Sequence, residues 1–123
     1  MKRALQGVCA TVVAVAAIVA VAPASAKDAR CAIKTTDGAY SGPCGFTREK
    51  GGSFSLEPVG RPDFFKHAKD DPGITDISVE IEGSSADVRG LTTDGVNSRW
   101  GAARRSRKDR ACWVGDDFSI CVY

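Results

Sequence analysis

Beyond residue 26 the chain alternates polar and apolar positions, a pattern typical of strands that bury one face. The clearest case is Ile74–Glu82, where Ile77, Val79 and Ile81 share one face and the residues between them are polar or acidic. A helix would place its apolar residues three or four positions apart instead. We therefore predict a strand here, with one face in a core and the other in water.

Similar short stretches between glycine turns predict further strands. Turns are expected at Asp37-Gly38, Gly51-Gly52 and Asp94-Gly95. Pro58 is typical of an edge strand, and residues 64–68 are compatible with one helical turn packed on the sheet. The fold class is therefore all-β, a small antiparallel barrel or sandwich of seven or eight short strands. The other expected strands cover residues 31–35, 40–46, 53–59, 86–91, 96–101, 111–114 and 118–123.

The first 26 residues have the pattern of a secretory signal peptide. Residues 1–3 are a cationic start, residues 8–21 are almost entirely apolar, and Ala24 and Ala26 have the spacing that signal peptidase requires. The alternative is a retained membrane anchor, but the apolar run is shorter than the roughly 20 residues of a spanning helix. We expect cleavage after Ala26, which leaves one exported domain of residues 27–123.

The cysteines support an oxidising destination. Cys9 leaves with the signal peptide, and the remaining Cys31, Cys44, Cys112 and Cys121 predict two disulfides. Four cysteines allow three pairings, of which we favour the two local ones, Cys31 with Cys44 and Cys112 with Cys121, because each closes a hairpin. Each bridge would stabilise the fold by about 3 kcal/mol. Their spacing does not fit a zinc site.

Charge excludes partners that bind through a global field. The 123 residues include 17 basic and 15 acidic side chains, and loss of Lys2 and Arg3 makes the two counts equal. No overall field then attracts nucleic acid or a membrane, and we expect neither as a partner after cleavage. Basic residues nevertheless gather within twelve positions, balanced only by Asp109: Arg99, Arg104, Arg105, Arg107, Lys108 and Arg110.

The residue types needed for catalysis are scarce. The only histidine, His67, has no evident serine or cysteine partner, so we expect an exposed loop residue rather than a general base. Asp63, Asp70 and Asp71 lack the alternating spacing of a calcium loop. Gly51-Gly52 lacks the strand and helix that flank a phosphate-binding loop. We predict no enzyme activity, no cofactor and no metal.

The basic segment and the tryptophan before it are the strongest functional candidates. Trp113 is expected in the core beside Cys112, whereas Trp100 next to Arg99 has the composition of a protein-interface anchor. A disulfide hairpin just after the segment would hold the base of a projecting loop and reduce the entropy lost on binding. The alternative is a plain solvated connection between two strands. The predicted partner-binding residues are Asn97, Ser98, Arg99, Trp100, Arg104, Arg105, Ser106, Arg107 and Lys108.

A family resemblance gives this segment a possible role. Gly-Pro-Cys44, Gly-Gly-Ser53-Phe54 and Ala-Cys112-Trp113 are landmarks of a chain that looks like small periplasmic proteins of Gram-negative bacteria. Among them it most resembles the periplasmic inhibitors of c-type lysozyme. The resemblance implies a β-barrel in the periplasm that inserts a loop into the lysozyme cleft. There a serine and a basic side chain of the inhibitor meet the catalytic carboxylates.

The resemblance leaves two candidate loops. Asp37-Gly38-Ala39-Tyr40 and Lys50-Gly51 partly match the family's Ser-Gly, tyrosine and Lys-Gly pattern, with Asp in place of Ser. The later segment, residues 98–108, carries more charge, and we favour it. Arg99 or a neighbouring cation would face the lysozyme carboxyl groups, with Ser98 or Ser106 donating a hydrogen bond.

Two other classes of function stay open. One is a non-catalytic envelope or adhesive module that binds a cell-wall or host component through the same basic patch. The other is a small hydrolase or wall-binding domain whose chemistry the sequence does not reveal. Inhibition of lysozyme remains the prediction that best joins export, charge and resemblance.

Overall fold

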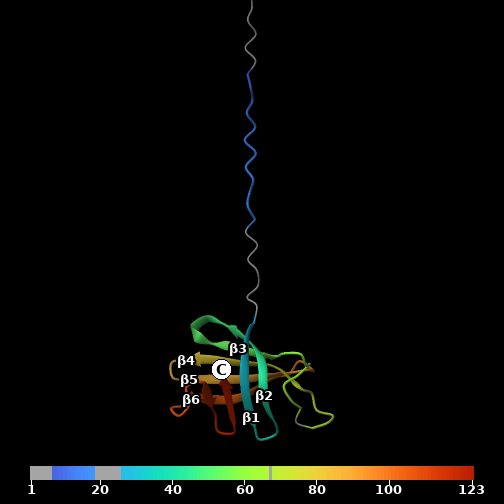
Figure 1. Ribbon diagram of the computed structural model, residues 1–123, viewed down its shortest axis with the longest axis vertical. Helices are drawn as coiled ribbons and strands as arrows, with labels where there is room; N and C mark the ends of the chain where they lie inside the picture. The colour runs from blue at the N-terminus through green and yellow to red at the C-terminus, as the bar shows by residue number, and fades with distance from the viewer. Residues whose placement is uncertain (1–6, 19–25, 67) are drawn as a thin grey trace, which may run out of the picture.

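Eight antiparallel strands close into a barrel in the computed structural model, which describes residues 7–18, 26–66 and 68–123 (Figure 1). Each strand pairs with the next along the chain, and β8 pairs back with β1. This confirms the all-β fold class. The strands are β1 (Lys27–Thr35), β2 (Ala39–Arg48), β3 (Phe54–Pro58), β4 (Ile74–Glu82), β5 (Ser85–Thr92), β6 (Asn97–Arg105), β7 (Cys112–Val114) and β8 (Phe118–Val122), with a short 3-10 turn η1 (Lys50–Gly52) between β2 and β3.

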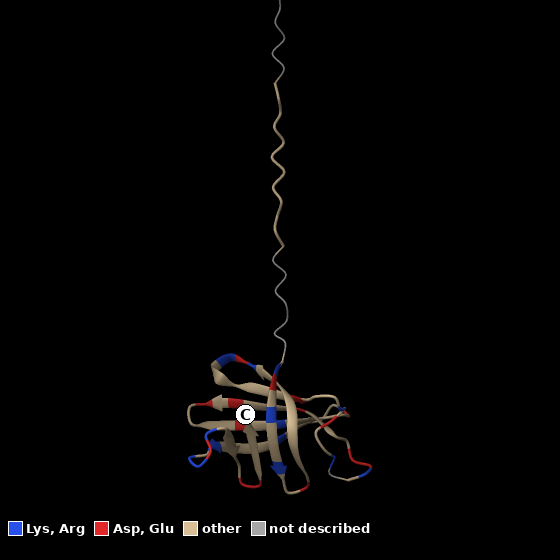
Figure 2. Ribbon diagram, in the orientation of Figure 1, with Lys and Arg blue, Asp and Glu red and all other residues tan. Residues whose placement is uncertain are grey.

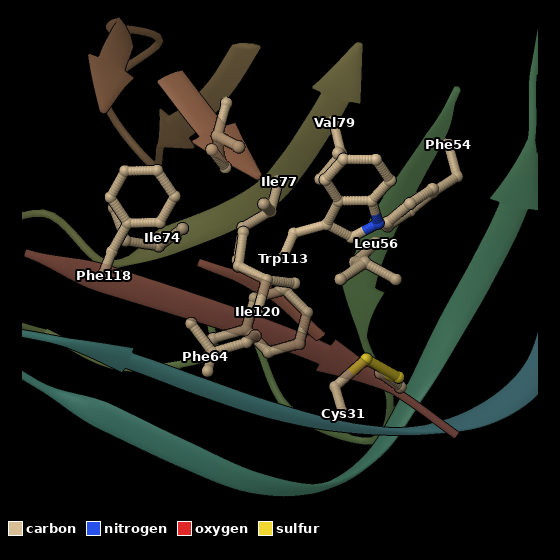
Figure 3. Close-up of a cluster of buried hydrophobic side chains, with 14 of the residues drawn as sticks. Cys31, Phe54, Leu56, Phe64, Ile74, Ile77, Val79, Trp113, Phe118 and Ile120 are labelled. Atoms are coloured by element: carbon tan, nitrogen blue, oxygen red, sulfur yellow. A yellow bond between two sulfur atoms is a disulfide. The ribbon is translucent and has the colours of Figure 1, made fainter. Parts of the chain in front are cut away.

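The barrel interior is filled by the apolar face of each strand. On β4 the predicted alternation is confirmed, because Ile77 and Val79 are fully buried and Glu80 is exposed. Figure 3 shows Leu56, Trp113 and Ile120 meeting inside the barrel. Among the described residues, every strand and every buried core side chain lies between residues 27 and 123.

Both predicted disulfides are present. Cys31–Cys44 joins β1 to β2, and Cys112–Cys121 joins β7 to β8 at directly opposite positions. The Cα atoms of the second pair are 4.0 Å apart. Trp113 is only 3% exposed, which confirms that it belongs to the core. The second bridge and this tryptophan anchor the end of the connection between β6 and β7.

Two local predictions are wrong. β3 is not an edge strand, because it pairs with β2 on one side and β4 on the other, and Pro58 is its last residue. Phe64 and Phe65 pack in the core but form no helical turn. Their backbones are instead hydrogen-bonded to Ile74. Phe64 N–H donates to Ile74 O at 2.8 Å, and Ile74 N–H donates to Phe65 O at 3.1 Å.

The N-terminal segment is separate from the barrel. Residues 7–18 form neither helix nor strand and are exposed, and Figure 1 shows them extending away from the barrel. Within the described ranges, the structure contains no helix of the length and apolarity needed to cross a membrane. Ala24 of the predicted cleavage motif and the histidine His67 lie outside the described residues, whereas Ala26, after which cleavage is predicted, is described.

The connections between strands alternate between the two ends of the barrel, and this separates the charges. The end formed by the β2–β3, β4–β5 and β6–β7 connections, the start of β1 and the end of β8 is called the basic end. The opposite end is called the acidic end, although cations also occur there. Figure 2 shows blue after β2 and β6 and red in the turns after β1 and β7. Basic-end cations include Lys27, Arg48, Lys50, Arg105, Arg107, Lys108 and Arg110, and acidic-end acids include Asp37, Asp70, Asp71, Asp94, Asp116 and Asp117.

Candidate binding site at the basic end

The predicted binding segment is mostly a strand, not a loop. Asn97–Arg105 forms β6, which pairs with β5 along its length and with β7 through Arg104 and Arg105. Closing the barrel requires these pairings, because they satisfy the backbone N–H and C=O groups of the segment. Only residues 106–111 connect β6 to β7, and we call them the basic loop.

The strand separates the predicted residues into two groups. Arg99 and Arg105 are six positions apart, which is about 20 Å along a strand. Asn97, Ser98 and Arg99 thus lie toward the acidic end, and the Arg99 guanidinium is paired with Asp87 Oδ1 at 2.7 Å. Arg89 approaches the other oxygen of Asp87 at 3.8 Å. Arg99 and Ser98 therefore do not join the cations of the basic loop.

Trp100 is partly buried and packs against the core of the barrel. The β5–β6 register shifts between Val88 and Arg89, so Trp100 is the extra residue of a bulge, and Gly101 after it has a φ of 122°. A bulge turns a side chain to the other face of its strand. The Trp100 ring lies 5.9 Å from the Phe118 ring, and it fills space left by Gly90, where a Cβ would come within 2.7 Å of the indole.

The earlier candidate loop is also divided between the two ends. Tyr40 is near the start of β2, and its hydroxyl donates to Pro43 O, while the Arg61 guanidinium lies 5.0 Å from its ring centroid. Lys50 lies beyond the other end of β2, in η1. The two parts of the family pattern therefore lie toward opposite ends of the barrel.

Hydrogen bonds within the basic loop fix its backbone. Ser106 Oγ accepts the N–H groups of Lys108 and Asp109, each at 3.2 Å. Ser106 N–H donates to Cys112 O at 2.9 Å, and Cys112 N–H donates to Asp109 O at 3.0 Å. A loop held in this way loses little conformational entropy when it binds.

Asp109, the acid of the basic loop, is engaged by the protein itself. Its Oδ1 accepts Ala111 N–H at 3.0 Å and its Oδ2 accepts the Tyr123 hydroxyl at 2.6 Å. These bonds, first that from Tyr123, lower the pKa of Asp109, and the same bond raises the pKa of Tyr123. Tyr123 is held in turn by two backbone hydrogen bonds to Arg30.

The loop cations remain available to a partner. Arg107, Lys108 and Arg110 are exposed, and across the parts of the chain that the structure describes they form no ion pair. Sequence analysis named Arg107 and Lys108 but missed Asp109 and Tyr123 as the pair that holds the loop. No sequence pattern indicates this pair, because Tyr123 is brought to Asp109 only when β8 pairs in the closed barrel.

Two hollows lie beside the loop. The first, of about 570 Å³, is lined by Arg105, Arg107 and Arg110, the two serines Ser84 and Ser106, and by Ile81, Gly83 and Trp113. The second, of about 410 Å³, shares Arg105, Arg110 and Trp113 with the first. The guanidinium of Arg105 lies 4.8 Å from the Trp113 ring centroid, a cation-π contact that fixes its position.

Among the described residues no group of three or more His, Cys, Asp or Glu side chains is placed to hold a metal ion. Of the three acidic residues that the sequence offered as calcium ligands, Asp63 is buried, and Asp70 and Asp71 are exposed. Burial, and secondarily the charges of Glu57 and Glu49, raise the pKa of Asp76 on β4.

Comparisons with known proteins found no match. No family model, no curated protein and no solved structure matches the chain.

Proposed function

We propose that the protein is a periplasmic inhibitor of a c-type lysozyme, and that it acts by placing the basic loop in the acidic active-site cleft. The observation that carries this proposal is the capture of Asp109 by Tyr123 and Ala111, which leaves the cations of the loop without an internal partner. Glycosidases of this kind work with a pair of carboxyl groups flanking the scissile bond. A preformed cationic loop matches such a cleft in charge.

Export is part of the proposal. Cleavage after Ala26 would release residues 27–123, which contain the whole barrel and both disulfides. Disulfides form and persist in oxidising compartments such as the periplasm. The protein would thus be folded where a lysozyme attacks the cell wall.

The side chains of the loop suit recognition of carboxylates. Guanidinium groups donate paired hydrogen bonds to a carboxylate, and Arg107 and Arg110 are both exposed at the loop. Ser106 Oγ already accepts two backbone N–H groups, so its hydroxyl proton is free to be donated to a partner. Complementary charge would also speed the encounter and make inhibition weaker at high salt.

The test is a lysis assay in which residues 27–123 are titrated into c-type lysozyme acting on bacterial cell walls. The variant Arg107→Glu, Lys108→Glu, Arg110→Glu reverses the loop charge and is expected to weaken inhibition by at least about a hundredfold, since like charges would face each other. The matched control Lys34→Glu, Lys66→Glu, Lys69→Glu makes the same change in net charge away from the basic loop. It should inhibit within about threefold of the wild type.

Two results would contradict the proposal. One is unchanged lysis at a large molar excess of the wild-type chain. The other is equal loss of inhibition in the loop variant and the control, because net charge rather than the basic loop would then explain binding. Circular dichroism of both variants checks that the barrel is intact.

A further inference from the structure

The first hollow of the basic end has the chemistry of a small-molecule site. Its volume of about 570 Å³ lies within the range of about 300–1,000 Å³ typical of such sites. This is far more space than one carboxylate from a partner protein would fill. It is lined by residues of the β4–β5 turn and of the basic loop, together with Ile81, Arg105 and Trp113.

The charged side chains that line this hollow are all positive. Arg105, Arg107 and Arg110 all contribute, and no acidic side chain of the described ranges lines it. The Arg105 guanidinium contacts the Trp113 ring, and guanidinium N–H groups are strong donors to oxygen anions. Oxygen anions such as carboxylates are the natural ligands of guanidinium groups placed in this way.

The uncharged lining adds a second requirement. Ser84 of the β4–β5 turn and Ser106 of the basic loop both line the hollow, and Ser106 Oγ accepts two backbone N–H groups, which leaves its hydroxyl proton to be donated. Hydroxyl groups are suited to bind the hydroxyls of a sugar ring, and the half-buried Ile81 offers an apolar contact to its C–H face. A simple anion would satisfy the arginines and leave both serines and most of the space to water.

We propose that this hollow binds a sugar acid, with the ring between Ser84 and Ser106 and the carboxylate against Arg107 and Arg110. The site would act independently of lysozyme inhibition, because it needs only the chain itself. An acidic saccharide bound there would occupy the same end as the basic loop and would compete with a protein partner for it.

The experiment is an NMR titration of residues 27–123 with three probes: glucuronate, glucose and acetate. Glucuronate has both ring and carboxylate, glucose has only the ring, and acetate has only the carboxylate. We expect glucuronate to shift the backbone amides of Gly83, Ser84, Arg107 and Arg110 saturably. Its dissociation constant should be at least tenfold lower than those of acetate and glucose.

Variants locate the binding. Arg107→Gln and Arg110→Gln should each weaken glucuronate binding at least fivefold and leave the spectrum of the remaining barrel unchanged. The control Lys69→Gln removes the same charge away from this hollow and should have no effect. The proposal is overturned if glucuronate and acetate bind equally well, if the shifts lie elsewhere, or if no saturable shift occurs. Lysozyme is absent from this experiment, so its outcome is separate from that of the proposed inhibition.

Discussion

The two ends of the barrel use arginine and aromatic side chains in opposite ways. At the acidic end, Trp100 is packed on Phe118 and Arg99 is neutralised by Asp87. At the basic end, Arg105 lies over Trp113, while Arg107 and Arg110 are exposed. Both ends therefore place arginine near tryptophan, but Arg99 beside Trp100 is paired with Asp87, whereas Arg107 and Arg110 form no described ion pair.

The difference comes from which groups the neighbouring aspartate contacts. Asp87 stands on β5 beside β6, so it reaches the Arg99 guanidinium on the outer wall. Asp109 is in the basic loop itself, yet its oxygens accept Tyr123 and Ala111 instead of pairing with an arginine. The number of cations in a segment therefore does not determine whether they are available to a binding partner. What decides it is whether the neighbouring acid pairs with those cations or with other groups.

The largest expected effect concerns Trp100. Trp100→Ala removes a ring that fills the space over Gly90, and we expect it to lower the free energy of unfolding by about 3 kcal/mol. Inhibition of lysozyme should change by no more than about twofold, because this residue is remote from the basic loop. Urea unfolding and the lysis assay measure the two quantities. Full stability combined with lost inhibition would instead make Trp100 the interface anchor.

The next effect tests how Asp109 is held. Tyr123→Phe removes the hydroxyl that donates to Asp109 Oδ2, so the carboxylate becomes free to pair with the arginines of its own loop. We expect inhibition to weaken by about three- to tenfold. Adding Asp109→Asn to this variant should restore most of it, since the competing charge is gone.

Tyr40 supplies the matched control for that experiment. Like the Tyr123 hydroxyl, the Tyr40 hydroxyl donates a hydrogen bond, in this case to Pro43 O. Tyr40, however, lies toward the acidic end of the barrel. Tyr40→Phe should leave inhibition unchanged. Equal losses in Tyr123→Phe and Tyr40→Phe, or no rescue by Asp109→Asn, would show that the hydroxyl does not act through the loop charge.

Sequence patterns predicted those parts of the fold that depend on neighbouring residues. The alternation in β4 and the spacing of Cys112 and Cys121 are local signals, and both led to the observed structure. The candidate site was predicted less well. The cluster of arginines suggested a loop, but the alternation of a strand continues through β6, where Ala102 is exposed and Ala103 is buried. The pairing of Arg99 with Asp87 depends on β5–β6 register, which charge spacing does not encode.

The smallest expected effect concerns an acid on the outer wall. Burial and the charges of Glu57 and Glu49 raise the pKa of Asp76 above 3.8, so its ionised form destabilises the folded state. Asp76→Asn should therefore increase the free energy of unfolding near neutral pH, by under about 1 kcal/mol because solvent screens a half-buried carboxylate. The gain should shrink as pH falls through the raised pKa and vanish below pH 3.8, where Asp76 is protonated in both states.

Urea unfolding of Asp76→Asn across this pH range measures the effect, with Glu80→Gln as its control on the same strand. Glu80 is exposed, so the control removes the same charge without relieving burial. If both variants gain equally, general repulsion among acids explains the result, and the position of Asp76 does not. If only Asp76→Asn gains, its carboxylate is held at a cost to the fold, unlike that of Asp109, whose hydrogen bonds favour the ionised form.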